Sequence, residues 1–245
     1  MARLFDDGSS QYLRIDSAVL VAEPLTMAYW FNTNAGALGN AQRMIGISHG
    51  AAIGGRSKWA IHIRANAAGI IAQKTDSVAV SGNAISTGSV STNTWMHAAG
   101  VFTNDTSRAV YLNGSEDTNA TDISTDFTAD TTAIGAYYTA DAGEDFLSGM
   151  EAEVGIWNVA LTQAEINVLK TGFSPLAVRP QSLVSYWPVI GRTSPEIDIV
   201  GGYDMTLING PTVADHPPMM YLVSPMIVYV PTADVSVVGP FPTFL

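Results

Sequence analysis

The stretch NTWMHAAGVFTNDTSRAVYLNGS, residues 93–115, decides the fold class of this chain. In its first half, Trp95 and His97 fall on one face of an extended strand and their neighbours fall on the other. Both faces are nearly apolar, which predicts a strand inside a β-sandwich. The second half ends on Asn113-Gly114, a pair that tolerates positive φ and is a strong signal for a β-hairpin.

Strand patterns continue along most of the chain. MEAEVGIWN, residues 150–158, alternates in a way that predicts Met150, Ala152, Val154 and Ile156 on the core side. The intervening side chains, which include Glu151 and Glu153, are expected to point away from the core. For these two glutamates we expect a solvated outer face or a subunit interface, with a groove lining as the alternative.

One short helix interrupts the strands. Thr162 and Glu165 have the spacing of a capping box, and Gly172 is a good helix terminator. Many short strands, frequent turn signals and a single short helix together predict an all-β sandwich or jelly roll.

Composition narrows the classes of function. The 245 residues include no cysteine, which excludes disulfides and thiolate catalysis. The net charge of −11 argues against nucleic acid and anionic membranes as partners. The N-terminus has no apolar segment of signal-peptide length, so we expect synthesis and retention in a cytoplasm.

Three stretches together resemble a known family. FDDGSSQYLRIDSAVLVAEPLTMAYWFNT (residues 5–33), the stretch 93–115 and FLSGMEAEVGIWNVALTQAEINVL (residues 146–169) are similar to the LamG-like domains of the concanavalin A-like jelly-roll family. The resemblance implies a jelly-roll sandwich, which we place at residues 1–216, with Trp30 as a core aromatic.

The next segment, residues 183–218, resembles a segment that follows LamG-like domains in proteins of phages and prophages. It runs from Tyr186-Trp187-Pro188 through Ser-Pro-Glu-x-Asp to Val-Ala-Asp-His-Pro-Pro. This resemblance implies a component of a bacteriophage virion, so the expected location is the virion after synthesis in the host cytoplasm.

Within that segment, Glu196 and Asp198 also look like part of a glycoside hydrolase motif. A retaining glycosidase needs two carboxyl groups about 5–5.5 Å apart. Laminarinase-type strands supply the second carboxyl four or five residues after the first, where this chain has Val200 and Gly201. We therefore interpret Glu196 and Asp198 as turn-forming residues that accept backbone hydrogen bonds, and expect no enzyme.

The sequence gives weaker indications of a metal site and of a sugar-binding site. The family resemblance implies that a calcium ion could bind on a loop, and Asp141, Glu144 and Asp145 are the candidate ligands. Tyr137 and Tyr138 are the candidate glycan contacts because they are expected to be exposed. Trp30, Trp95 and Trp187 lie on strand patterns and are expected in the core.

The last segment, residues 217–245, is apolar, rich in proline and almost uncharged. Proline is poor material for central strands, and a free tail would be more polar. We expect an extended arm that docks on a partner. The docking residues that we expect are Met219, Tyr221, Val223, Met226, Val228, Tyr229, Phe241 and Phe244.

The sequence thus predicts a non-enzymatic structural protein of a phage virion, either a capsid decoration or a head or tail appendage. Expected partners are other virion proteins, such as the major capsid protein, and further copies of the chain. Two alternatives stay open. One is a carbohydrate-binding adhesin on the virion surface that attaches to host or environmental glycans, and the other is a glycoside hydrolase.

Overall fold

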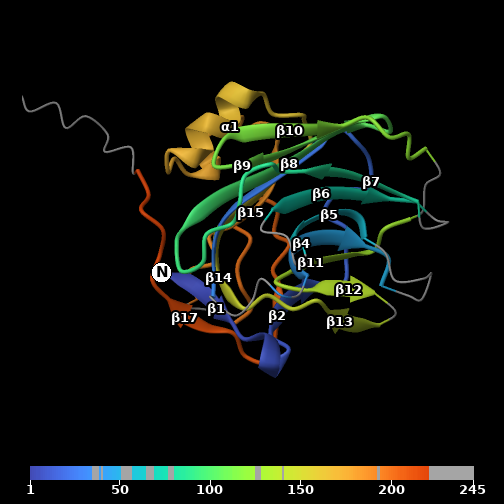
Figure 1. Ribbon diagram of the computed structural model, residues 1–245. Helices are drawn as coiled ribbons and strands as arrows, with labels where there is room; N and C mark the ends of the chain where they lie inside the picture. The colour runs from blue at the N-terminus through green and yellow to red at the C-terminus, as the bar shows by residue number, and fades with distance from the viewer. Residues whose placement is uncertain are drawn as a thin grey trace, which may run out of the picture.

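The computed structural model describes residues 1–34, 39, 41–50, 57–64, 69–76, 80–124, 128–139, 141–191 and 194–220. Two antiparallel sheets stack face to face and form a sandwich (Figure 1). In the described residues, sheet A has eight strands, which in spatial order are β10 (Ser115–Asn119), β9 (Ser107–Leu112), β8 (Met96–Asn104), β3 (Leu25–Thr33), β14 (Gly149–Trp157), β1 (Ala2–Phe5) and β17 (Thr212–Ala214), with β15 (Leu183–Trp187) paired to β14.

Sheet B faces sheet A. Its described strands are, in order, β16 (Thr206–Ile208), β2 (Tyr12–Ile15), β11 (Thr131–Ile134), β4 (Gln42–Ser48), β5 (Ser57–Ile63), β6 (Ile70–Thr75) and β7 (Ser81–Ile85). A two-stranded hairpin, β12 (Tyr137–Thr139) and β13 (Ala142–Glu144), lies beside sheet B (Figure 1). The predicted all-β jelly-roll sandwich is confirmed.

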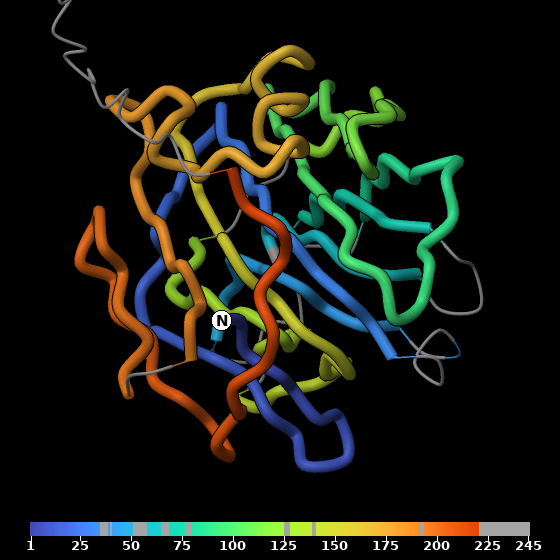
Figure 2. The backbone as a smooth tube through the Cα atoms, turned by 90° about the vertical axis from the view of Figure 1, so that its left-hand side faces the viewer, coloured from blue at the N-terminus to red at the C-terminus, as the bar shows by residue number. Residues whose placement is uncertain are grey.

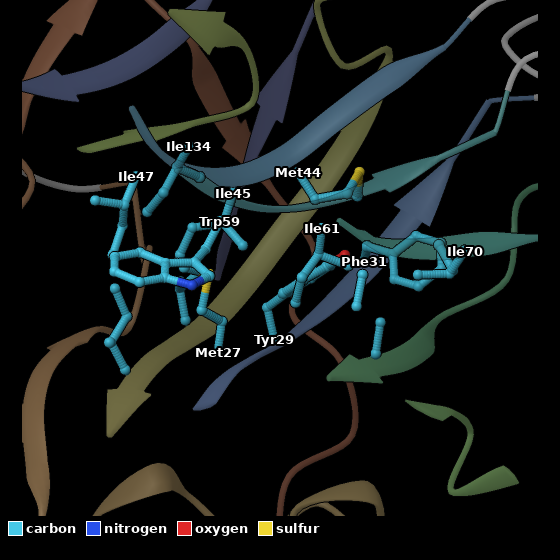
Figure 3. Packing of buried hydrophobic residues seen from close by; sticks show 14 of the residues in the cluster. Met27, Tyr29, Phe31, Met44, Ile45, Ile47, Trp59, Ile61, Ile70 and Ile134 are labelled. Carbon is cyan, nitrogen blue, oxygen red and sulfur yellow. The ribbon is translucent and has the colours of Figure 1, made fainter. Parts of the chain in front are cut away.

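The main core fills the space between the two sheets. Figure 3 shows Met27, Tyr29 and Phe31 of β3 packed against side chains of sheet B, among them Trp59 and Ile61 of β5. These side chains are almost completely buried. Burial of apolar surface stabilises the fold by about 25 cal/mol per Å², so this layer is the main source of stability.

A second buried cluster lies on the outer face of sheet A. There α1 (Gln163–Lys170) and the 3₁₀ turn η3 (Pro175–Ala177) cover Trp157, and Ile166 and Leu169 are the buried residues of the helix. A further 3₁₀ turn, η1 (Asp7–Ser9), precedes β2. No helix among the described residues is long and apolar enough to cross a membrane.

Two local predictions are confirmed. Thr162 and Glu165 form the capping box of α1, in which the Glu165 carboxylate accepts the Thr162 N–H at 2.8 Å. Asn113 and Gly114 both have positive φ, 48° and 79°, at the turn between β9 and β10. As expected, β8 is an interior strand, and both of its faces contribute to buried clusters.

A β-bulge in β14 overturns part of the predicted alternation. The pairing of β14 with β3 shifts register between Ala152 and Gly155, and Glu153 at the bulge has a φ of 57°. An extra residue in a strand shifts the alternation by one position. The side chains before it therefore lie on the face opposite to the predicted one. Val154 and Ile156 do face the main core as predicted, because they lie after the bulge.

Before the bulge, the prediction is wrong. Glu151 lies directly opposite Phe31, and directly opposed residues share one face of a sheet. Phe31 belongs to the main core, so Glu151 points inward, whereas Met150 is partly exposed and belongs to no buried cluster. Sequence alternation alone could not reveal this, because nothing in MEAEVGIWN marks the bulge.

The end of the described chain runs over the outer face of sheet A. After β17, residues 215–220 pass alongside β14 toward the end of α1 (Figure 2), and the Met220 N–H donates to the Gly172 carbonyl at 2.8 Å. Of the predicted docking residues, Met219 is partly buried here. The rest of the predicted arm, from Tyr221 to Phe244, lies outside the described residues.

Candidate functional site

A polar hollow lies where the ends of β2, β4 and β11 meet the β12–β13 hairpin. Its volume is about 420 Å³. The lining residues are Arg14, Asp16, Gly50, Asp130, Thr131, Tyr138 and Asp141. The hollow therefore brings together one candidate glycan contact, Tyr138, and one candidate calcium ligand, Asp141, with charged residues that the sequence did not single out.

Asp130 is fixed by hydrogen bonds at the centre of this lining. Its Oδ1 accepts the Gly50 N–H at 2.7 Å and the Thr131 hydroxyl at 3.0 Å, and its Oδ2 lies 2.8 Å from His49 Nδ1. Partial burial alone would raise the pKa of Asp130, but these hydrogen bonds and His49 outweigh it and leave the pKa below its usual value. Asp130 is thus a carboxylate acceptor held in one orientation.

Arg14 and Tyr138 also line the hollow, and they contact each other. The Arg14 guanidinium lies over the Tyr138 ring, 4.4 Å from its centroid, and pairs with Asp16 at 2.9 Å. Tyr12 stacks near Tyr138 with ring centroids 6.2 Å apart. These contacts leave Tyr138 only 7% exposed, so its expected exposure is wrong, although its edge still lines the hollow.

Backbone hydrogen bonds connect the walls. The Asp141 N–H donates to the Gly50 carbonyl at 2.8 Å, and the Ser48 hydroxyl donates to the Tyr138 carbonyl at 2.6 Å. Asp141 itself has a φ of 59°, which an Asp tolerates better than most residues. The hairpin is thereby held against the end of β4, and the hollow has a preformed shape.

Tyr137 lies on β12, beside the hollow, and is partly buried. The Arg43 guanidinium sits 4.6 Å from its ring centroid and also donates to Gln73 at 2.9 Å. Burial lowers the pKa of Arg43, and burial with the adjacent Arg43 charge lowers the pKa of His62 well below its usual value. Tyr137 therefore belongs to a packed polar network, not to the exposed loop that the sequence suggested.

The predicted calcium ligands do not gather into one cluster. Asp141 lines the hollow, whereas the Asp145 carboxylate lies 3.5 Å from Arg43 Nε. Glu144 is exposed at the end of β13. Among the described residues, no three His, Cys, Asp or Glu side chains are grouped so that they could hold a metal. Calcium binding by these residues stays a prediction.

Glu196 and Asp198 are structural carboxylates, as the sequence analysis expected. The Glu196 carboxylate is 1% exposed and accepts Arg3 Nε at 2.7 Å and the Ile190 N–H at 3.1 Å. Asp198 is 4% exposed, and its two oxygens accept the Ser185 hydroxyl and four backbone N–H groups. Carboxylates that are buried and saturated in this way cannot reach a polysaccharide substrate.

Glu151 and Glu153 are also buried, which contradicts the expected solvated face or interface. Glu153 accepts the Tyr186 hydroxyl at 2.6 Å and lies 3.2 Å from His216 Nε2, so it ties the closing segment to sheet A. Glu151 is 0% exposed, and neither of its oxygens has a hydrogen-bond partner among the described residues. This burial raises the pKa of Glu151 well above its usual value.

The expected burial of the three tryptophans is right for one of them. Trp187 is fully buried in the main core. Trp30 and Trp95 are only partly buried and lie outside the buried clusters. Because both faces of β3 and of β8 are apolar, the sequence periodicity could not show which face of each strand is turned toward the main core.

Arg14, Asp16 and Asp130 were not among the site residues predicted from the sequence. A signal existed for the first two, since Arg14 and Asp16 are two residues apart at the end of a strand and so share a face. No local signal connects them to Asp130, because only the pairing of β2 with β11 brings these residues to the same hollow.

A family model for the concanavalin A-like lectin/glucanases superfamily matches residues 7–167. The chain belongs to this superfamily. The match runs from η1 into α1 and includes every described residue that lines the polar hollow. It does not extend to the closing segment with Glu196 and Asp198.

Solved structures agree with this lectin/glucanase-type fold. A putative carbohydrate-binding protein from Bacteroides ovatus has a TM-score of 0.63 and 18% identity, and the match covers 89% of this chain and 61% of that one. A native heptameric SAP-like pentraxin from Limulus polyphemus has a TM-score of 0.54 and 15% identity, over 69% of this chain and 81% of that one. At these identities the similarity concerns the fold. No curated protein sequence matches the chain.

Proposed function

We propose that this lectin-like protein is a non-enzymatic carbohydrate-binding module whose site is the polar hollow beside the β12–β13 hairpin. The observation that carries the proposal is the convergence of Arg14, Asp16, Asp130 and Asp141 around the edge of Tyr138 in one open hollow. Sugar hydroxyl groups both donate and accept hydrogen bonds. Fixed carboxylates accept from them, and a guanidinium donates to them.

The charges of the described lining residues favour a neutral sugar. Three of these residues are carboxylates, and Arg14, the one cation among them, is already paired with Asp16. A sialic acid or a sulfated sugar would bring a further negative charge close to these carboxylates, and like charges repel. The similarity of fold to the putative carbohydrate-binding protein from Bacteroides ovatus supports the general class of ligand.

Replacement of Asp130 by asparagine tests the site. A hydrogen bond from a sugar hydroxyl to the Asp130 carboxylate is charge-assisted and contributes about 1.5–3 kcal/mol to binding. We therefore expect D130N to weaken the binding of a neutral sugar about tenfold or more. Isothermal titration calorimetry measures the change. E144Q is the matched control, because Glu144 is an exposed carboxylate outside the hollow. Equal affinity of D130N and E144Q would place the sugar site elsewhere.

A second candidate function is that of a virion structural protein, as a capsid decoration or a head or tail appendage. The resemblance of residues 183–218 to a segment of phage proteins favours it. The two functions are compatible, since a virion-attached module could be the predicted adhesin. The partners proposed here are other virion proteins, such as the major capsid protein, and further copies of the chain.

Truncation before Pro217 tests this second function. If residues 217–245 are the docking arm, the truncated chain should fold but lose co-sedimentation with phage particles that bind the full chain. Thermal unfolding checks that the sandwich is intact, and a sugar-binding titration checks the hollow. Undiminished co-sedimentation of the folded, truncated chain would contradict the arm hypothesis.

A further inference from the structure

A second surface carries aromatic side chains toward solvent, on the part of the outer face of sheet A that α1 leaves open. Trp30 and Trp95 are partly exposed there, whereas Trp59, Trp157 and Trp187 are at most 1% exposed. Trp30 follows the alternation of β3, whose Tyr29 and Phe31 point into the main core. Met96 also points into the core, so its neighbour Trp95 faces outward with Trp30.

The two tryptophans belong to adjacent segments of sheet A, since Trp30 lies on β3 and Trp95 directly precedes β8. The register pairs Trp30 with His97 and Phe31 with Met96, so Trp95 is diagonal to Trp30. Diagonal positions on adjacent strands are within reach of aromatic side chains. The ring of His97 meets that of Trp30 edge-on, with centroids 5.6 Å apart, and fixes one end of the aromatic pair.

Asn32 lies beside these rings, next along the outward side of β3 after Trp30. It is 7% exposed, and its Oδ1 has no hydrogen-bond partner among the described residues. Buried polar atoms ordinarily have a partner, so an acceptor of this kind next to a solvent-facing aromatic pair points to a donor that comes from outside the chain.

The surface continues from Asn32 across three more strands. Asn32 pairs with Met150 of β14, Met150 with Leu4 of β1, and Leu4 with Thr212 of β17. It ends in a hollow of about 360 Å³. The residues that line this hollow are Leu4, Phe5, Asp6, Gln11, Asn34, Ser148 and Thr212.

Among the described lining residues, the polar side chains are amides and hydroxyls, apart from one carboxylate. That carboxylate, on Asp6, already accepts the Gly8 N–H at 3.1 Å and the Ser9 hydroxyl at 2.6 Å. No Lys or Arg is among the described residues that line the hollow. We call the outward side chains of Trp30, Asn32, Trp95, Met150 and Leu4, together with this hollow, the sheet A platform.

We propose that the sheet A platform binds an uncharged polysaccharide chain laid across the strands, as a second site separate from the hollow beside the hairpin. The C–H faces of sugar rings are apolar and would bury surface on Trp30 and Trp95. Sugar hydroxyls would bond to Asn32, Asn34 and Ser148. The described residues of the platform include no Lys or Arg that could pair with sulfate or carboxylate groups, so the ligand is a neutral polymer.

Fluorescence quenching by iodide tests this proposal. Iodide reaches exposed indoles, and three of the five tryptophans are fully buried, so quenching reports on Trp30 and Trp95. Hexasaccharides of neutral polymers, namely cellohexaose, xylohexaose and maltohexaose, are added at constant ionic strength. We expect at least one to lower the quenching constant several-fold, and sulfated oligosaccharides to leave it unchanged. If none of the neutral hexasaccharides lowers it, the proposal is overturned.

Variants separate this site from the one proposed above. For W95A we expect the affinity for the protecting hexasaccharide to fall about tenfold or more, and for W95F, which keeps an aromatic ring, much less. Trp95 lies outside the buried clusters, so both variants should fold. D130N should leave the protection of the tryptophans unchanged, whatever it does to the first site.

Two further outcomes would overturn the proposal. One is full affinity of folded W95A for the hexasaccharide. The other is protection from iodide that grows with protein concentration in the absence of sugar, together with a doubled mass in sedimentation. That result would assign the platform to contact with a second copy of the chain.

Discussion

Replacement of Glu196 by alanine is expected to lower the free energy of unfolding by about 3–5 kcal/mol. Glu196 and Arg3 form an ion pair with 1% and 4% of their side chains exposed, between the closing segment and the first strand. Arg3 also donates to the Pro211 carbonyl at 3.0 Å. The variant leaves a buried guanidinium without the carboxylate of Glu196, and water cannot replace that carboxylate.

Chemical denaturation in urea measures the effect, with E144A as the exposed-carboxylate control. A double variant, R3M with E196L, removes both charges and fills the space with apolar side chains. Such replacements of a buried pair are often neutral or stabilising, so the double variant should regain most of the loss. A loss below about 1 kcal/mol in E196A would show that this ion pair does not hold the closing segment.

The second large effect concerns Glu151, and we expect E151Q to be increasingly more stable than the natural chain as the pH rises. Burial holds the pKa of Glu151 well above its value of 4.5 in the unfolded chain. Above about pH 5 the unfolded chain loses the proton while the folded chain keeps it. The stability of the natural chain therefore falls with rising pH, by up to about 1.4 kcal/mol per pH unit, until the pKa of the folded state is reached.

Glutamine has nearly the same shape and does not titrate, so E151Q should lack this loss. As the pH rises above about 5, the difference in unfolding free energy should grow in favour of E151Q, by up to about 1.4 kcal/mol per pH unit. Urea denaturation across this pH range measures it, and E144Q, on the exposed hairpin, should show no such trend. A difference that stays constant with pH would mean that Glu151 is ionised in the folded protein or reached by water.

Local features of the fold could be predicted because they depend on neighbouring residues. The capping box at Thr162 and Glu165 and the turn at Asn113-Gly114 are determined by side chains within a few positions of each other. The carboxylates of Glu196 and Asp198 were interpreted correctly for the same reason, since nearby glycines and the missing third carboxyl marked a turn.

The errors arose where strand pairing decides the outcome. The bulge at Glu153 lies in the pairing of β14 with β3, and it turns Glu151 into the core. Tyr138 was expected to be exposed, but the pairing of β2 with β11 brings Arg14 and Tyr12 onto its ring. These contacts join residues more than one hundred positions apart.

The hollow beside the hairpin was missed for the same reason. Arg14, Asp130 and Tyr138 come from three elements, and only the order β2–β11–β4 in sheet B assembles them. The two partly exposed tryptophans were equally hidden, because a strand with two apolar faces does not show which face the second sheet covers. The fold class can be predicted from the sequence. The surfaces proposed to bind sugars can be found only when the register of the strands is known.

A glycan array probed with the labelled full-length chain and with D130N tests the central claim most directly. We expect that the natural chain binds neutral glycans in preference to sialylated or sulfated ones, and that D130N loses part of this binding. Binding restricted to anionic glycans and unchanged in D130N, or no binding to any glycan, would contradict it.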